Sequence, residues 1–205
     1  EVLRQTTTAH SFGLEMELLS AKEAQELWPI MDIKDVYGAA FLPTDGQANP
    51  TDITQALAKG ARKKGAKIIE EIRALKVILE DGVIKGLETD KGIINCEKIV
   101  CCGGQWTRQF AETAGVNVPL VSFQHQYLVT EEIDGVKSDL PTLRDPDRLI
   151  YFKEEVGGLV MGGYEPNPLS WAEKSVPEDF HFSLLDSDYD HFELIMNNAL
   201  GRVPL

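Results

Sequence analysis

The most regular pattern in the chain is the run of apolar and polar positions in its second half. Residues 118–130, 148–154 and 158–163 have the composition and alternation of strands. A stretch rich in Pro, Asp and Gly, 131–147, separates the first two. Strands arranged in this way predict an antiparallel sheet with one face on a core and the other open to a site.

Helical spacing of apolar residues marks several other segments. Ser20 and Glu23 have the spacing of a capping box, and Pro29 ends the helix that they begin. Apolar residues three and four apart predict further helices from Thr51 or Asp52 to Gly65, over 107–114 and over 186–200. Along the sequence, these predicted helices precede and follow a middle region whose pattern predicts strands.

The middle region predicts short strands at 66–70, 74–79, 83–89, 92–96 and 98–102, with a β-turn at Asp81-Gly82. A helix followed by a strand favours a parallel α/β layer, and the hairpins before Ile99 favour a small antiparallel meander on it. The predicted fold class is therefore mixed, with an α/β layer followed by an antiparallel sheet.

A Gly-Gly pair follows the apolar run Ile99-Val-Cys-Cys102 and precedes the predicted helix at 107–114. Glycines lack a Cβ, so the backbone of Gly103 and Gly104 can approach a flat or anionic ligand, and a helix start offers unpaired N–H groups. Trp106 can form a wall beside a planar ligand. A tight turn without ligand is the alternative interpretation.

Polar aromatic residues occur within the predicted strands. His125 and Tyr127 alternate around Gln126 and therefore share a strand face. Tyr151 faces away from its two neighbours. If its face meets that of His125, an imidazole and a phenol converge, and both can orient a substrate or accept a proton. A structural histidine is the alternative, and we expect Tyr164, beside Gly162-Gly163, to be structural.

Composition excludes several classes of function. The 205 residues carry a net charge of −13, without the basic face expected of a nucleic-acid-binding protein. The sequence contains no apolar run of the roughly 20 residues that a membrane-spanning helix needs. Its three cysteines (Cys96, Cys101 and Cys102) have no metal-site spacing and are expected to be buried thiols in a reducing compartment. Because the chain lacks an initiator Met and stops in mid-pattern, we expect a segment of a longer protein.

Several runs resemble the glycine oxidase and D-amino-acid oxidase superfamily of flavoproteins, and the resemblance follows essentially the whole chain in order. The runs shared with the superfamily are Asp45-Gly-Gln-Ala-Asn-Pro50, Leu57-Ala-Lys-Gly-Ala-Arg62, Gly65-Ala-Lys-Ile68 and Cys102-Gly-Gly-Gln-Trp106. Others look like its sarcosine and dimethylglycine dehydrogenase branch, namely His125-Gln-Tyr-Leu-Val-Thr130, Arg144-Asp145, Ile150-Tyr-Phe-Lys-Glu154 and Gly162-Gly-Tyr-Glu-Pro-Asn-Pro168.

This resemblance implies FAD as cofactor and the oxidative N-demethylation of small N-methyl amines by hydride transfer to the flavin. It implies that His125 and Tyr151 are the catalytic residues of the substrate site. Ala74 matches the position of a backbone contact to adenine, and Gly103, Gly104 and Trp106 match the turn beside the flavin. It also implies that a separate domain of the full protein can bind tetrahydrofolate.

The implied architecture is part of an FAD-binding Rossmann-like layer together with an antiparallel substrate domain, as in D-amino-acid oxidase. Residues 1–50 would lead into the substrate domain, 51–116 would form part of the FAD-binding region with its meander, and 117–205 would form the antiparallel substrate-binding region. The family's Gly-x-Gly-x-x-Gly loop does not occur in these residues, and we expect it outside them.

Two other readings of the sequence stay open. One is a non-catalytic relative that resembles the regulatory subunit of pyruvate dehydrogenase phosphatase, whose tail pattern is similar to residues 186–192. The other is a domain that folds but is inert in isolation. The preferred N-methyl amine and the electron acceptor are left open. The expected location is the cytoplasm, or the mitochondrial matrix in a eukaryote.

Overall fold

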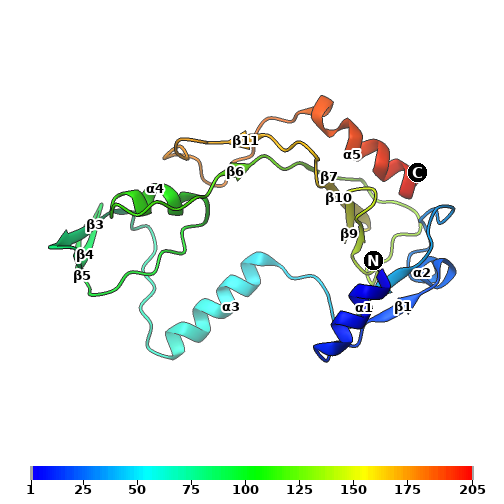
Figure 1. The fold of residues 1–205 in the computed structure, drawn as a ribbon, viewed down its shortest axis with the longest axis horizontal. Coiled ribbons are helices and arrows are strands. Elements are labelled where there is room, and N and C mark those ends of the chain that lie inside the picture. Colours follow the sequence, from blue (N-terminus) through cyan, green and yellow to red (C-terminus); the bar gives the residue numbers. More distant parts are fainter. Residues whose placement is uncertain (1, 205) are drawn as a thin grey trace. The chain divides into compact units, whose positions relative to one another are not determined.

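The computed structural model describes residues 2–204, which group into two compact units (Figure 1). Unit 1 contains the residues up to 49, 125–168 and those from 186 onward, and unit 2 contains 50–124 and 169–185. Residues 117–124 and 169–185 thus group with the meander and not with the second-half sheet. The functional assignment of the predicted segments 1–50, 51–116 and 117–205 stays a prediction.

Unit 1 is built on a four-stranded antiparallel sheet with the strand order β7-β10-β9-β8. Its strands are β7 (Tyr127–Val129), β8 (Leu143–Asp145), β9 (Ile150–Glu155) and β10 (Gly158–Gly163). The antiparallel sheet is confirmed, as are the strands predicted at 148–154 and 158–163.

The single strand predicted at 118–130 is wrong, because that stretch forms two short strands with different partners. β6 (Ser122–Phe123) pairs with β11 (Ser170–Trp171) in unit 2, whereas β7 pairs with β10 in unit 1. Between them, the side chain of Gln126 bonds both the backbone N–H and the carbonyl of Asp188, at 2.8 and 3.0 Å. The apolar pattern runs through both strands and does not reveal the change of partner.

One face of the unit 1 sheet carries its hydrophobic core. The register aligns Leu128, Met161, Phe152 and Leu143 in one row across the four strands. These side chains pack with Trp28, whose indole N–H donates to the carbonyl of Pro141 at 2.7 Å. Helix α5 (Tyr189–Arg202) covers this core with buried residues that include Phe192 and Ile195, somewhat later along the chain than the predicted helix at 186–200.

Two further helices and a two-stranded ribbon complete unit 1. They are α1 (Val2–Ser11), α2 (Ala21–Leu27), and the antiparallel pair of β1 (Glu17–Leu19) with β2 (Ala39–Phe41). The capping box predicted before α2 is confirmed. The backbone N–H of Glu23 donates to the Ser20 hydroxyl at 3.3 Å, and the backbone N–H of Ser20 donates to the Glu23 carboxylate at 2.7 Å.

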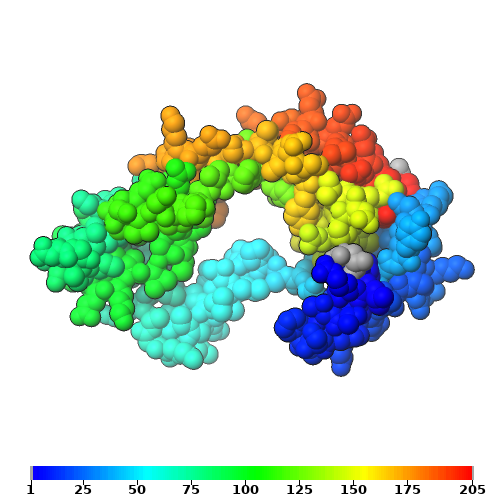
Figure 2. Space-filling model, viewed as in Figure 1, coloured from blue at the N-terminus to red at the C-terminus, as the bar shows by residue number. Residues whose placement is uncertain are grey.

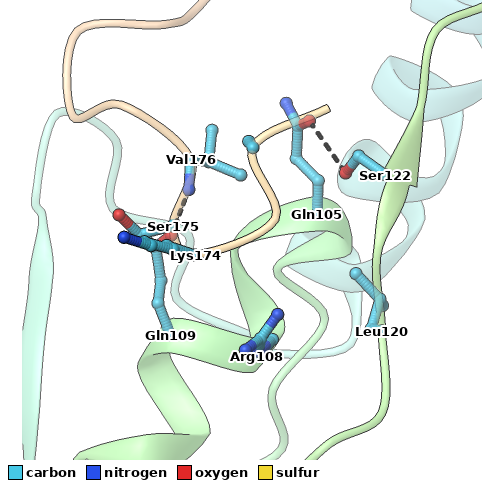
Figure 3. Close-up of a pocket in the computed structure, with 9 residues that line it drawn as sticks. Gln105, Arg108, Gln109, Leu120, Ser122, Lys174, Ser175 and Val176 are labelled. Atoms are coloured by element: carbon cyan, nitrogen blue, oxygen red, sulfur yellow. Dashed lines mark hydrogen bonds between the residues drawn. The ribbon is translucent and has the colours of Figure 1, made fainter. Parts of the chain in front are cut away.

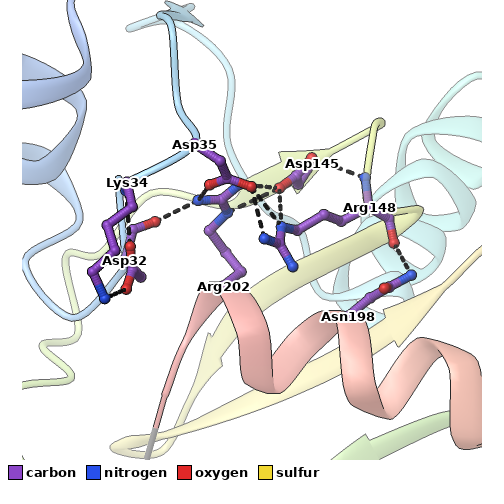
Figure 4. Close-up of polar contacts among 7 residues, drawn as sticks. All are labelled: Asp32, Lys34, Asp35, Asp145, Arg148, Asn198 and Arg202. Atoms are coloured by element: carbon purple, nitrogen blue, oxygen red, sulfur yellow. Dashed lines mark hydrogen bonds and ion pairs between the residues drawn. The ribbon is translucent and has the colours of Figure 1, made fainter.

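A cluster of ion pairs joins the end of α5 to β8 and to the loop after α2 (Figure 4). The Arg202 side chain, only 6% exposed, contacts Asp145 and Asp35, each at 2.9 Å. Arg148 also pairs with Asp35, at 2.7 Å. The buried guanidinium of Arg202 thus has carboxylate partners, which offset the cost of removing it from water.

Unit 2 contains an antiparallel meander of three strands, as predicted, in the order β3-β4-β5. They are β3 (Ala74–Glu80), β4 (Val83–Thr89) and β5 (Gly92–Asn95). The predicted turn between β3 and β4 is confirmed, with φ of +50° at Asp81 and +76° at Gly82. Such φ values at both central residues are those of a type I′ hairpin turn.

Two helical segments accompany the meander. Helix α3 (Pro50–Lys63) matches the predicted helix and has no buried residue; its side chains are drawn in cyan in Figure 2. A short 3₁₀ turn, η1 (Gly104–Trp106), leads into α4 (Thr107–Glu112), which is shorter than the predicted helix at 107–114.

The strands predicted at 66–70 and 98–102 do not form in the described part of the chain. An apolar run indicates that a segment tends to be buried, but a strand forms only when its backbone hydrogen-bonds to a neighbouring strand. Within residues 2–204 neither segment has such a partner. The described residues therefore contain no parallel pair of strands, although the mixed fold class as a whole is correct.

Candidate functional site

The open face of the unit 1 sheet carries a row of polar and aromatic residues. The register places Tyr127 of β7 opposite Gly162 of β10, Gly162 opposite Tyr151 of β9, and Tyr151 opposite Arg144 of β8. Neighbouring positions in a strand point to opposite faces, so this row lies on the face away from Phe152 and Met161. Four strands therefore contribute to one polar surface.

Three rings meet on this face. The centroids of His125 and Tyr151 are 6.3 Å apart and their planes are inclined by 21°. Tyr164 contacts both rings, with centroids 5.7 Å from that of His125 and 5.9 Å from that of Tyr151. The structure thus brings together the two residues singled out in the sequence, and it adds Tyr164, which the sequence reading treated as structural.

Charged groups flank the rings. The Glu165 carboxylate lies 3.4 Å from Nδ1 of His125, and its side chain is only 5% exposed, whereas that of His125 is 42% exposed. The guanidinium carbon of Arg144 lies 5.0 Å from the centroid of the Tyr164 ring, within the range of a cation–π contact. Among the described residues, no carboxylate pairs with Arg144 in an ion pair. The face therefore offers a histidine in contact with a carboxylate, and a cation without a counter-charge.

Burial raises the pKa of the Tyr151 phenol, and the neighbouring Tyr164, Glu165 and Tyr127 raise it further. Removal from water disfavours the phenolate, and so does nearby negative charge. Tyr151 is therefore a neutral phenol at physiological pH and can donate a hydrogen bond to a ligand. The imidazole of His125, the other group considered from the sequence, has in its neutral form a ring nitrogen whose lone pair can accept a proton.

The glycine turn predicted to lie beside the flavin belongs to unit 2. Gly104 has a φ of +55°, and a Cβ built there would have no heavy atom within 4 Å. Trp106 follows at the end of the 3₁₀ turn, partly exposed. Ala74 begins β3, opposite Thr89, and is exposed. Bare backbone with open space next to an aromatic side chain is compatible with a flat cofactor such as an isoalloxazine.

A small pocket also lies in unit 2, where polar side chains hold the segment 172–176 (Figure 3). Gln109 accepts a hydrogen bond from the backbone N–H of Val176 at 2.8 Å, and the Arg108 guanidinium donates to the carbonyl of Glu173 at 2.6 Å. With a volume of about 10 Å³, the pocket holds about one water molecule. The hydrogen bonds around the pocket anchor this loop, and the pocket is too small for a substrate.

Residues 2–204 contain no group of three or more His, Cys, Asp or Glu side chains arranged to hold a metal ion. Within the same range, none of the helices has the length and apolar character needed to cross a membrane.

Comparison with known proteins identifies the family. The model of the FAD dependent oxidoreductase family (DAO) matches residues 1–204. The chain belongs to this family. Its members are flavoproteins, and the FAD expected from the resemblance is confirmed at the level of the family.

Curated members of the family give finer similarities. The chain is 36% identical to human mitochondrial sarcosine dehydrogenase, over all of this chain and 22% of that protein. It is 37% identical to the formaldehyde-forming 4-methylaminobutanoate oxidase of Paenarthrobacter nicotinovorans, over all of this chain and 25% of that protein. It is 33% identical to the mouse mitochondrial pyruvate dehydrogenase phosphatase regulatory subunit, over 94% of this chain and 22% of that protein. The chain thus spans about a quarter of the length of these relatives.

Solved structures of family members confirm the fold. L-proline dehydrogenase from P. horikoshii superposes with a TM-score of 0.78 and 26% identity, over 95% of this chain and half of that one. The D-amino-acid-oxidase-like architecture expected from the resemblance is therefore correct.

Sequence reasoning missed Glu165 and Arg144 as candidate site residues. Glu165 follows Tyr164 directly, and Arg144 lies in a short strand after a loop. The runs that carry the resemblance contain both, but no local periodicity connects them with His125. Their place at the site depends on how β8 and β10 pair with β9 and β7.

Proposed function

We propose that the full-length protein that contains this chain is an FAD-dependent dehydrogenase of small N-methyl amino acids, acting by oxidative N-demethylation. The observation that carries the proposal is the cluster of His125, Tyr151 and Tyr164 on the open sheet face. Further support comes from two relatives. Their substrates, sarcosine and 4-methylaminobutanoate, each join an N-methyl amine to a carboxylate.

His125 has the role of the base in this proposal. A secondary amine is mostly protonated in water at neutral pH, and an ammonium has no lone pair to assist the loss of a hydride from its methyl group. The partly exposed imidazole takes a proton from the ammonium, so that an N–H bond of the substrate breaks and an N–H bond of the ring forms. The amine is left neutral and able to react.

The remaining residues of the face orient the substrate. Tyr151, held neutral by its raised pKa, donates a hydrogen bond, and the Tyr164 ring lies beside it. The uncompensated charge of Arg144 attracts the substrate carboxylate. FAD, when bound, supplies the acceptor for the hydride. We propose that Gly103, Gly104 and Trp106 hold the flavin ring and that the backbone of Ala74 contacts the adenine.

Anaerobic reduction of the flavin tests the proposal directly. The purified full-length protein is mixed with sarcosine, dimethylglycine or 4-methylaminobutanoate, and flavin absorbance is followed, with an artificial electron acceptor for turnover. We expect bleaching with at least one of them, and a higher KM for an N-methyl amine without a carboxylate. If none of the three reduces the flavin, the protein is not an N-methyl amino acid dehydrogenase.

A second candidate is a non-catalytic regulatory protein. The similarity to the mouse phosphatase regulatory subunit covers 94% of the chain, and the similarities to the two enzymes cover all of it. The run His125-Gln126-Tyr127 favours the dehydrogenase, since it supplies the base that a purely regulatory protein does not need. Specific capture of a phosphatase catalytic subunit by a full-length protein that oxidises no amine would favour the regulatory role instead.

We also infer a location in the cytoplasm, or in the mitochondrial matrix if the source is eukaryotic. Two of the three curated relatives carry the word mitochondrial in their names. Fractionation of cells that express the tagged full-length protein tests this inference.

A further inference from the structure

Glu165 is the acidic residue that the structure places at the His125 ring. It lies two residues after the end of β10, next to Tyr164, and its side chain is 5% exposed. A carboxylate removed from water to this degree destabilises the fold unless it has a partner. Among the described residues, its ion-pair contact is with His125, so the two groups are best understood together.

The carboxylate of Glu165 contacts one of the two ring nitrogens of His125, Nδ1. The carboxylate oxygen lies 3.4 Å from Nδ1, and the His125 side chain as a whole is 42% exposed. A carboxylate beside Nδ1 favours a proton on that nitrogen and leaves Nε2 with its lone pair. The ring therefore has one nitrogen that faces a buried carboxylate and a second nitrogen that can act as base.

We propose that Glu165 is a positioning residue for His125, which keeps the proton on Nδ1 and directs Nε2 to the ammonium of the substrate. This inference rests on the proposed function and deepens it. The substrate proton moves to Nε2, the proton on Nδ1 stays, and the imidazolium that results lies against the Glu165 carboxylate. The positive charge thus moves from the substrate nitrogen to the His125 ring, where the Glu165 carboxylate already lies beside it as counter-charge.

The surroundings support this role and limit it. Tyr151 of β9, Tyr127 of β7 and Tyr164 are titratable groups beside His125 on this face, and Arg144 of β8 is a nearby cation. Lys153 and Glu155, farther along β9 on the same face, pair with each other at 2.7 Å. The Glu165 charge is also among the causes that raise the pKa of Tyr151. Glu165 therefore acts on both members of the candidate pair without contacting the substrate.

Three substitutions in the full-length protein separate the functions of this carboxylate. Glu165→Met removes both charge and acceptor, Glu165→Gln retains an acceptor without charge, and Glu165→Asp restores the charge at a shorter reach. We expect the limiting rate of flavin reduction by sarcosine to fall about 100-fold or more in Glu165→Met, with less loss in Glu165→Gln and partial recovery in Glu165→Asp. KM is expected to change by only a few-fold, since substrate contacts remain.

Nitrogen NMR of the wild-type protein and the variants, with ¹⁵N-labelled histidine, gives a readout that does not depend on activity. The His125 signal, assigned by its loss in His125→Gln, should report a proton on Nδ1 in the wild type and a redistribution toward Nε2 in Glu165→Met. The matched control is Glu131→Gln, an exposed carboxylate of the same unit, which should alter neither signal nor rate.

Each outcome decides a different point. An unchanged rate and tautomer in Glu165→Met would overturn the proposal. So would a loss of rate that Glu165→Asp does not relieve, together with loss of bound flavin, because that pattern belongs to a structural residue. If the wild-type protein oxidises no N-methyl amine, the proposed function fails. The NMR comparison then still tests whether Glu165 sets the tautomer.

Discussion

The ring of Tyr151 lies across Gly162 on the neighbouring strand, in the space that any other residue's side chain would fill. A Cβ built on Gly162 would stand 2.3 Å from the Tyr151 hydroxyl oxygen and 2.4 Å from the ring carbon that bears it. Real Cβ atoms do not approach other atoms so closely. The absence of a side chain at Gly162 is therefore what allows Tyr151 to reach its place beside His125 and Tyr164.

We expect Gly162→Ala to move the Tyr151 ring and to lower amine oxidation by about 100-fold, since displacements of an ångström in a site have effects of this size. The measurement is the rate of flavin reduction by sarcosine in the full-length protein. Gly60→Ala is the matched control. A Cβ built on Gly60 has no heavy atom within 4 Å among the described residues, and alanine favours the helix α3 in which it lies. Equal rates in both variants would contradict the placement of Tyr151.

The second prediction concerns His125. In the full-length protein, His125→Ala should lower the rate of flavin reduction by roughly 100- to 10,000-fold, because it removes the proposed base. Bound flavin, measured by its visible absorbance, should stay at the wild-type level, since we assign His125 to the substrate. Turnover at the wild-type rate would show that His125 is not the base.

The third prediction follows from the raised pKa of Tyr151. Since burial and its neighbours keep the phenol protonated through the neutral range, Tyr151→Phe removes a hydrogen-bond donor and no group that titrates there. We expect a rate lowered on the order of 100-fold at every pH between about 6 and 9, with the shape of the pH profile retained. A variant whose profile loses its acidic limb would indicate that Tyr151 itself is the base.

The fourth prediction concerns the ion-pair cluster of Figure 4. Hydrogen bonds from Arg148 and then Arg202 lower the pKa of Asp35 from 3.8 to about 2. The folded state thus holds this proton less tightly than the unfolded chain. The stabilisation is present above about pH 4 and is lost as the pH falls toward 2. Asp35→Asn should therefore lower the melting temperature at neutral pH and lose less stability than the wild type between pH 4 and pH 2.

Arg202 gives a sharper test of the same cluster. Its side chain is 6% exposed, and Arg202→Met leaves Asp145, which is 12% exposed, without this partner. Removal of one member of a buried pair typically costs about 3–5 kcal/mol. Thermal unfolding of the full-length protein should therefore shift further in Arg202→Met than in Lys34→Met, whose ion pair with Asp32 has a lysine that is 91% exposed. Similar shifts would show that burial is not what gives the cluster its strength.

The fifth prediction concerns the isolated 205-residue chain. Its sequence contains no Gly-x-Gly-x-x-Gly loop to bind the pyrophosphate, and the Gly103-Gly104 turn offers a contact to one part of the cofactor alone. We expect the purified chain to bind FAD weakly or not at all in a fluorescence titration. A yellow protein with nearly one flavin per chain would refute this expectation.

The sequence by itself determined the features that depend on neighbouring residues. The capping box at Ser20, the turn at Asp81-Gly82 and the hairpin of β9 and β10 all follow from local composition and alternation, and the structure confirms them. The shared face of His125 and Tyr127 follows from the same rule. The ordered motifs were sufficient to indicate the family, which the comparisons confirm.

Only the tertiary structure decided which strands are partners and in which register. That choice divides 118–130 between two sheets and leaves 66–70 and 98–102 without a partner in the described chain. It also places Gly162 under Tyr151 and brings Glu165 to His125. Alternation specifies the face to which a side chain points, but strand register depends on contacts between residues that are distant in sequence. The local pattern therefore identified two members of the site, and the pairing of the strands supplied the others.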